Sequence, residues 1–247
     1  MKKLISVILS LVLCSLLIPA VAENASLAGV WYVTRAEVSG AEVQVVDPDA
    51  IKLTVSEDGT FTMATGNYGQ IQSGTWALDG SVLSLTVGEE TIAFGISGDE
   101  LVMDMNGAVV YLSRTLSESV ALPIIFLADS LEAFDGTWIP AAQISSGLYM
   151  PISAETAAGS KLVIENGRIS VLYDDGTGQF VESGVYEGAY EDGIMNAEDN
   201  SFMPTKISVS LREDGSLFFD SAIMMGEDVA MEMTIVYVRE GAAEAAD

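Results

Sequence analysis

The chain has 247 residues, and its 36 Asp and Glu against 10 Lys and Arg give a formal net charge of −26. This acidity excludes nucleic acids and anionic membrane surfaces as expected partners, because both are bound through clustered Lys and Arg. The chain contains no His and a single Cys, which excludes Ser-His-Asp catalysis, Cys-His catalysis and the usual zinc sites.

Residues 1–22 are predicted to be a secretory signal peptide, because Lys2 and Lys3 precede an apolar run that ends in small residues at Ala22. Cleavage after Ala22 leaves a mature chain without Cys, expected to be secreted or associated with the surface of a bacterial cell. The alternative is a lipoprotein signal built on Cys14, but a Leu precedes this Cys where Gly or Ala is usual. The apolar run is also short for a retained membrane anchor.

Residues 26–114 are predicted to form a first unit of about eight short strands. Apolar and polar residues alternate along most of this unit, which is typical of strands with one buried face. A less regular stretch occupies residues 39–50. Tight Asp-Gly, Gly-Asp and Asn-Gly turns join the strands and leave no room for crossover helices. An antiparallel meander of eight strands is expected to close into an up-and-down barrel.

Residues 134–240 repeat this order with longer connections, so the predicted fold class is all-β, with two tandem small antiparallel up-and-down barrels. The Ala-rich residues 152–159 are expected to form one or two helical turns, and an acidic connection is expected at residues 191–200. Residues 115–133 are rich in apolar side chains and are expected to be an ordered linker between the barrels. Residues 241–247 are expected to be a disordered tail.

Each unit begins with the pattern Gly-x-Trp and ends with a similar strand. The first strands carry GVW at residues 29–31 and GTW at residues 136–138. The last strands read VVYLSR at residues 109–114 and IVYVRE at residues 235–240. These heads and tails mark the limits of two copies of one structural unit.

A Gly-x-Trp on the first strand and an Arg on the last strand of an eight-stranded meander resembles the lipocalin and calycin superfamily. The segments DGTF and SGTWALDGSVLSLTV, at residues 58–61 and 73–87, look like the small lipocalin-like domains of secreted bacterial proteins. The resemblance implies that the Trp closes one end of each barrel and that the Arg lies across it. The implied barrel-closing pairs are Trp31 with Arg114, and Trp138 with Arg239.

The two closing strands differ in the spacing between Tyr and Arg. Arg114 lies three residues after Tyr111, whereas Arg239 lies two residues after Tyr237. If the tyrosines are equivalent, the two arginines point to opposite faces of the last strand. The expectation is therefore that Arg114 contacts Trp31, and that Trp138 lacks the equivalent contact.

No residue pattern predicts catalysis, a cofactor or a metal. The acidic residues 191–200 offer oxygen ligands for calcium but lack the spacing of an EF-hand, so a solvated loop is the favoured interpretation. Four methionines suggest a copper(I) site as an alternative, but their alternation with Ile and Tyr favours core packing. They are Met224, Met225, Met231 and Met233.

The sequence thus predicts a non-enzymatic secreted binding protein that holds a small apolar ligand in a barrel or contacts an extracellular protein partner. The alternative is a structural or protein-interaction module with filled barrels, because eight strands enclose a space that side chains alone can fill. A cavity favours the first function, and an exposed apolar patch near the linker favours the second. The candidate ligand-lining residues are Leu53, Phe61, Trp76, Leu85, Phe94, Met103, Ile164, Val171, Phe219 and Met233.

Overall fold

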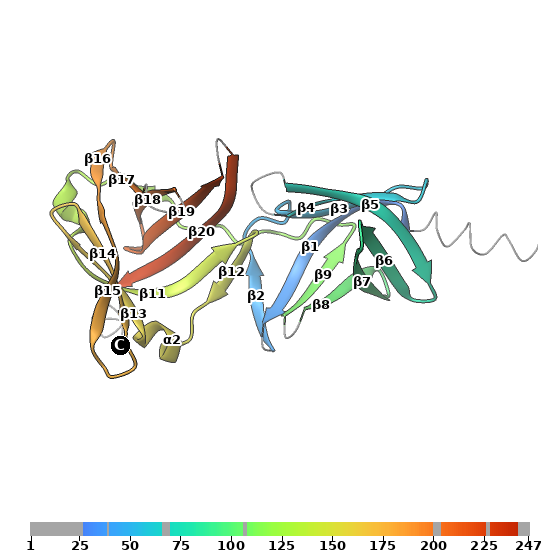
Figure 1. The fold of residues 1–247 in the computed structure, drawn as a ribbon, viewed down its shortest axis with the longest axis horizontal. Helices are drawn as coiled ribbons and strands as arrows, with labels where there is room; N and C mark the ends of the chain where they lie inside the picture. The colour runs from blue at the N-terminus through green and yellow to red at the C-terminus, as the bar shows by residue number, and fades with distance from the viewer. Residues whose placement is uncertain are drawn as a thin grey trace, which may run out of the picture. The chain divides into compact units, whose positions relative to one another are not determined.

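The computed structural model describes residues 27–38, 40–65, 70–105, 108–199, 204–225 and 228–241. The predictions for the signal peptide, Cys14 and most of the tail lie outside this part of the chain. Nearly all regular structure within it is β-strand, which confirms the all-β fold class. The chain divides into two compact units (Figure 1). The first unit contains the described residues up to Gly40, together with Pro48–Thr65 and Gln70–Ser117. The second unit contains Ala41–Asp47 and the described residues from Glu118 onward.

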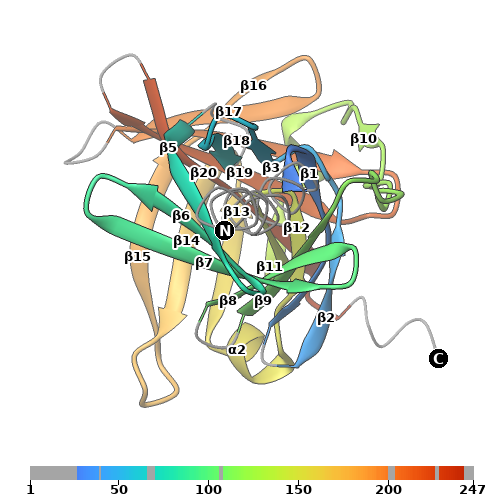
Figure 2. The same cartoon turned by 90° about the vertical axis from the view of Figure 1, so that its right-hand side faces the viewer.

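The first unit is a closed antiparallel barrel of eight strands. The strands pair in chain order, and the last strand pairs with the first, so the wall closes on itself. Figure 2 shows these strands in blue to green. They are β1 (Gly29–Val38), β3 (Ile51–Val55), β4 (Thr60–Thr65), β5 (Gln70–Asp79), β6 (Val82–Val87), β7 (Glu90–Ser97), β8 (Glu100–Met105) and β9 (Ala108–Ser113).

Alternation of apolar and polar residues places one face of each strand inside this first barrel. The strands thereby contribute large apolar side chains to a common core, which the hydrophobic effect stabilises. Several of them are fully shielded from solvent: Val33, Leu53, Leu83, Leu85, Phe94, Leu101 and Leu112. The polar edge of Trp76 is satisfied, because its Nε1 donates a hydrogen bond of 2.8 Å to the carbonyl oxygen of Ser56.

The second unit repeats the pairing order of the first with one interruption. Neighbouring strands form ladders, and β20 pairs with β11, but no ladder joins β15 to β17 among the described residues. These strands are β11 (Gly136–Ser145), β13 (Ser160–Glu165), β14 (Arg168–Asp174), β15 (Phe180–Glu187), β17 (Ile194–Asp199), β18 (Thr205–Arg212), β19 (Leu217–Met225) and β20 (Asp228–Arg239).

The expected acidic connection at residues 191–200 is instead largely a tight hairpin. β16 (Ala189–Glu191) pairs with the start of β17, and the chain reverses through Asp192 and Gly193. Both turn residues have positive φ, 49° and 82°, as a two-residue hairpin turn requires. The expected helical turns are present as α2 (Ala154–Ala158), which begins where the Ser153 hydroxyl accepts a hydrogen bond from the Thr156 backbone N–H.

The stretch described above as less regular contains a strand, β2 (Ala41–Val45), that belongs to the second unit. It pairs with β12 (Leu148–Pro151), placing Val45 opposite Leu148. Val43 and Val45 alternate with exposed residues and are buried, which is the pattern of a half-buried strand. The alternation covers only five residues, and the partner strand lies far along the chain, so local periodicity does not reveal which unit the strand joins.

The second half of the expected linker is an integral part of the second unit. We call residues 124–135 the end segment, because they lie across the end of the second unit at which β11 begins. The segment contains β10 (Ile125–Phe126), which pairs with β18, and the 3₁₀ helix η1 (Leu131–Phe134). Leu127 lies against Gly193 at the β16–β17 turn, and Tyr190 donates a hydrogen bond to the carbonyl oxygen of Ala128. Ala128 and Phe134 are buried in the core of this unit.

Candidate functional site

The repeated Gly-x-Trp has the same geometry in both units. Gly29 and Gly136 have φ angles of 140° and 142°, in the region that favours glycine. The indole Nε1 of Trp31 donates to the carbonyl oxygen of Leu27 at 3.1 Å, and that of Trp138 donates to the carbonyl oxygen of the residue four positions earlier, at 2.9 Å. The motif therefore fixes a buried Trp at one end of each unit.

An Arg from the last strand lies over the Trp in both units. The Cζ atom is 4.8 Å from the ring centroid for Arg114 and Trp31, and 4.5 Å for Arg239 and Trp138. A Cβ on Gly136 would lie 2.9 Å from Nη1 of Arg239, so the glycine also leaves room for the guanidinium. The expectation that Trp138 lacks this contact is wrong.

The error comes from treating Tyr111 and Tyr237 as equivalent. Arg239 lies directly opposite Trp138 in the β11–β20 ladder, and Tyr237 points into the core of the second unit. Tyr111 is only partly buried, and its ring lies 3.3 Å from the guanidinium carbon of Arg35. The arginines are thus equivalent, and the tyrosines lie on opposite faces of their strands.

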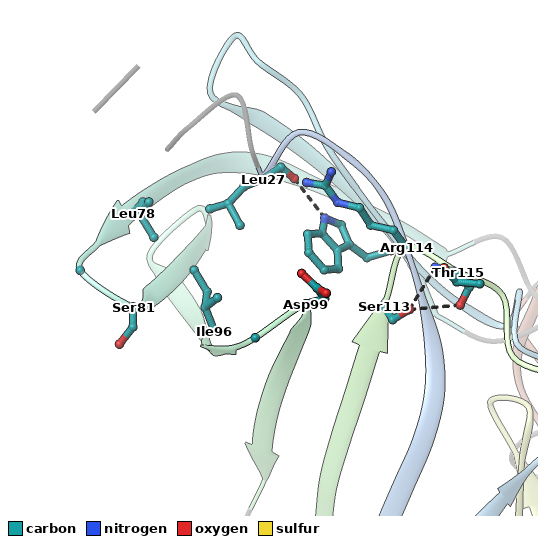
Figure 3. Close-up of a pocket in the computed structure, with 11 residues that line it drawn as sticks. Leu27, Leu78, Ser81, Ile96, Asp99, Ser113, Arg114 and Thr115 are labelled. Carbon is teal, nitrogen blue, oxygen red and sulfur yellow. Dashed lines mark hydrogen bonds between the residues drawn. The ribbon is translucent and has the colours of Figure 1, made fainter. Parts of the chain in front are cut away.

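A cavity of about 680 Å³ opens at the Trp31 end of the first barrel (Figure 3). Leu27, Leu78 and Ile96 line one side of it, and Arg114 and Asp99 lie on the other side. The lining comes from the residues before β1, the β5–β6 and β7–β8 turns, and the end of β9. Ser81, Ser113 and Thr115 also line it, so the cavity has both apolar and polar walls.

Residues 27–103 match a family model described as a lipocalin-like domain. The match begins two residues before the Gly-x-Trp strand and ends within β8. The first unit is lipocalin-like.

No curated protein matches the chain. Among solved structures, a Bacteroides fragilis protein provisionally named an outer membrane protein is 12% identical to this chain. The alignment covers 88% of this chain and 99% of that protein, with a TM-score of 0.24. A likeness at this level carries no argument about function.

The residues predicted to line a ligand site do not line this cavity. In the lipocalin-like barrel, Leu53, Phe61 and Phe94 are at most 1% exposed and belong to the core. The other predicted residues of this barrel are also buried: Trp76, Leu85 and Met103. The cavity-lining residues that the sequence reasoning missed are Leu27, Leu78, Gly80, Ser81, Ile96, Gly98, Asp99, Ser113 and Thr115. Leu78 and Ile96 each lie just before a hairpin turn at the Trp31 end. Their position at the ends of strands is the sequence feature from which they could have been predicted.

The predicted lining residues of the second unit also lie in or beside its core. Ile164 and Phe219 are buried, and Val171 packs against them. The Phe219 ring meets the ring of Tyr237 edge to face, with centroids 6.4 Å apart. Met233 lies beside a separate hollow over β18, β19 and β20.

The Trp138 end of the second unit differs from the Trp31 end of the lipocalin-like barrel. Arg239 Nη1 donates to the carbonyl oxygen of Asp135 at 2.8 Å, and its Nη2 donates to that of Ala133 at 3.1 Å. Both acceptors belong to the end segment. The hollow that remains there has a volume of about 280 Å³. Arg114 packs on Trp31 in the same way, and Ser26, the residue equivalent to Ala133, lies outside the described part of the chain.

The hollow beside Met233 contains a largely desolvated carboxyl group, that of Asp220. Burial raises its pKa, although the Thr234 hydroxyl, which donates a hydrogen bond to it, and the Arg212 charge act in the opposite direction. A raised pKa means that the folded protein binds this proton more tightly than the unfolded chain does. Stability therefore falls as pH rises from the usual Asp pKa to the raised value, and stays low above it.

Asp220→Asn is expected to raise the free energy of unfolding at about pH 7, because it removes a buried charge and keeps an acceptor for Thr234. The gain should shrink as the pH falls through the raised pKa toward the usual Asp pKa, because the wild-type carboxyl then becomes protonated and loses its charge as well. Urea unfolding across this range measures the gain. The exposed Asp129→Asn is the control, and an equal, pH-independent effect of the two substitutions would contradict the prediction.

The residues that the structure describes contain no group of three or more His, Cys, Asp or Glu that could hold a metal ion. The acidic side chains considered for calcium are spread along the β16–β17 hairpin. Among the helices in the described ranges, none is long and apolar enough to cross a membrane.

Proposed function

We propose that the protein is an exported, non-enzymatic binding protein that holds a small apolar molecule at the Trp31 end of its first barrel. The observation that carries this proposal is the cavity of about 680 Å³ at that end. This volume falls in the range of small-molecule sites, about 300–1,000 Å³. Its apolar lining, Leu27, Leu78 and Ile96, offers surface whose burial by a ligand is favourable.

This site lies outside the strand-enclosed interior, where the ligand was predicted from the sequence. The inward-facing side chains of the lipocalin-like barrel are almost completely shielded from solvent and pack together. The core ends at Trp31, which is 4% exposed, and the cavity begins beside it. A ligand at this end would therefore contact the end of the core without disrupting its packing.

The proposal includes a duplicated architecture, with lipocalin-like units at residues 26–114 and 134–240. Its support is the shared pairing order of the strands, the same Gly-x-Trp geometry and the same Arg contact on the Trp. In the second unit, the end segment lies at the Trp138 end, where a hollow of about 280 Å³ remains. The first unit carries the larger cavity and is the proposed binding unit, and the second is proposed to have a structural role. Export rests on the predicted signal peptide.

A second candidate function is contact with an extracellular protein, and it is favoured by an exposed apolar surface. Ile124 is 68% exposed and Leu127 is 61% exposed, although both are large hydrophobic residues. Exposed apolar patches commonly mark interaction sites. The neighbouring apolar residues of the second unit that are also exposed are Val120, Leu122, Ile125 and Phe126.

Titration of the mature chain with the neutral dye N-phenyl-1-naphthylamine tests the proposed site. The dye is expected to bind with enhanced fluorescence, and Ser81→Trp is expected to abolish this binding by filling the cavity from an exposed turn. Leu127→Ser, which alters the exposed apolar surface, is the control and should leave binding unchanged. Loss of dye binding in Leu127→Ser but not in Ser81→Trp would overturn the proposal and favour the second candidate.

A further inference from the structure

We propose that the hollow over β18, β19 and β20 of the second unit is a further binding site, which takes a small primary alkylammonium ion on the carboxylate of Asp220. This site is distinct from the cavity beside Trp31, and the inference does not rest on the proposed function. The hollow has a volume of about 320 Å³. Small-molecule sites span about 300–1,000 Å³, so this one suits a ligand of few atoms.

The hollow lies on the face of the sheet that points away from the main core of the second unit. Successive side chains of a strand point to opposite faces. Phe219 belongs to the main core, so the adjacent Asp220 points to the other face. Asp220 is paired with Ser208 on one side and Thr234 on the other, and all three line the hollow. The site is therefore a feature of the outer sheet surface, separate from the barrel interior.

A small side chain leaves the hollow open beside Asp220. In the next row of the same face, Ala222 is paired with Lys206 and with Glu232. The middle of this row is thus a methyl group between two long side chains. All three residues line the hollow, together with the amide side chain of Asn196. A short alkyl chain can lie against Ala222 while its charged end reaches Asp220.

An apolar cluster on the same face desolvates the Asp220 carboxyl. Phe218 and Val236 are buried in this cluster, and Ile144, which is paired with Thr234, packs against them. Burial accordingly raises the pKa of Asp220. The Thr234 hydroxyl donates a hydrogen bond to this carboxyl. An ionised carboxylate accepts several hydrogen bonds, so acceptor positions remain for a ligand.

The protein supplies no ion-pair partner for this carboxylate. Asp220 forms no ion pair with any described residue, and the rest of the chain contains Lys2 and Lys3 as its only Lys or Arg. Arg212 acts on the carboxyl electrostatically without forming an ion pair. Lys206 is exposed at the hollow. A desolvated charge without a partner is unfavourable, and an ammonium ion that donates to it would offset this cost.

The polar groups around the hollow match one ammonium ion. Two carboxylates, Asp220 and Glu232, line it with the single cation Lys206, which leaves one negative charge in excess. The three N–H donors of a primary ammonium can be shared among a carboxylate, a hydroxyl and an amide oxygen, as Asp220, Ser208 and Asn196 offer. The net charge of −26 on the chain also attracts cations.

Chemical-shift titration of the ¹⁵N-labelled protein tests the site with two probes of similar shape, n-butylamine, which is protonated at neutral pH, and n-butanol, which is uncharged. Butylammonium is expected to cause saturable shifts in β18, β19 and β20 around Asp220, and butanol to cause none. Asp220→Asn should weaken butylammonium binding about tenfold or more, as expected for loss of a charge-assisted hydrogen bond. This variant should remain folded, because the substitution is expected to stabilise the protein.

Asp129→Asn is the matched control, because it removes one charge at an exposed position and should leave the affinity within about twofold. Ala222→Leu should block binding by filling the hollow while Asp220 is retained. Ser81→Trp, which fills the cavity beside Trp31, should bind butylammonium as the wild type does. Unchanged affinity in Asp220→Asn, or equal weakening by Asp129→Asn, would overturn the proposal. Wild-type affinity in Ala222→Leu would also overturn it.

Discussion

Replacing Phe134 with Ala is expected to lower the free energy of unfolding of the second unit by about 3–5 kcal/mol, the usual cost of emptying the site of a core Phe. Phe134 is fully buried in that core, and its carbonyl oxygen accepts the hydrogen bond from Trp138. The two neighbouring carbonyls, at Ala133 and Asp135, accept the hydrogen bonds from Arg239. A displaced η1 would therefore disturb the whole Trp138 end.

Urea unfolding measures this loss, and hydrogen–deuterium exchange of β11 and β20 peptides assigns it to the second unit. Phe126→Ala is the matched control, because Phe126 lies in the same end segment but is 47% exposed. The control is expected to cost less than about 1 kcal/mol. Similar losses for the two substitutions would show that η1 does not hold the end segment in place.

Val45→Asp is expected to destabilise the second unit by about 3 kcal/mol or more, because it places an unpaired charge at a buried position. Val45 is 5% exposed and lies opposite Leu148 in the β2–β12 ladder. The backbone N–H of Val120 also donates a hydrogen bond to the carbonyl oxygen of Val45. The strand β2 therefore also holds the segment that leads to β10. Loss of β2 would remove both contacts.

Hydrogen–deuterium exchange is the decisive measurement for Val45→Asp. Faster exchange is expected in β12, although Val45 lies within residues 26–114, which the sequence assigns to the first unit. Gln44→Asp introduces the same charge at the adjacent exposed position and should have little effect. Faster exchange confined to β3 and β4 would contradict the assignment of β2 to the second unit.

Most of the strands follow from the sequence because their signals are local. Alternating residues and two-residue turns depend on neighbours in the chain, and they predict the closed first barrel and the order of strands in the second unit. The hairpin at Asp192 and Gly193 shows that composition alone does not predict a strand pair. The acidic residues around it suggest a loop, but two turn residues with positive φ join β16 to β17.

Features that depend on distant pairing do not follow from the sequence. The partner of β2 is β12, about 100 residues further along the chain, and local alternation does not identify it. The register places Tyr111 at the position of Val236 and Tyr237 at the position of Leu112, and a comparison of the two closing segments by their tyrosines misses this. The sequence places the candidate site among core residues such as Leu53 and Phe94. Alternation identifies the side chains that face the barrel interior, but it does not show whether those side chains fill the interior. Whether space remains at an end depends on how the turns there are placed, and their placement is not specified by periodicity.

The pairing of β2 with β12 also has a consequence for the order of folding. The two strands are separated by about 100 residues, so β2 leaves the ribosome or the export channel long before its partner does. Contacts between segments so distant in sequence form slowly, because chain closure costs entropy before the contact stabilises it. The second unit can complete its sheet only after β12 has emerged, and until then Val43 and Val45 remain available to incorrect partners.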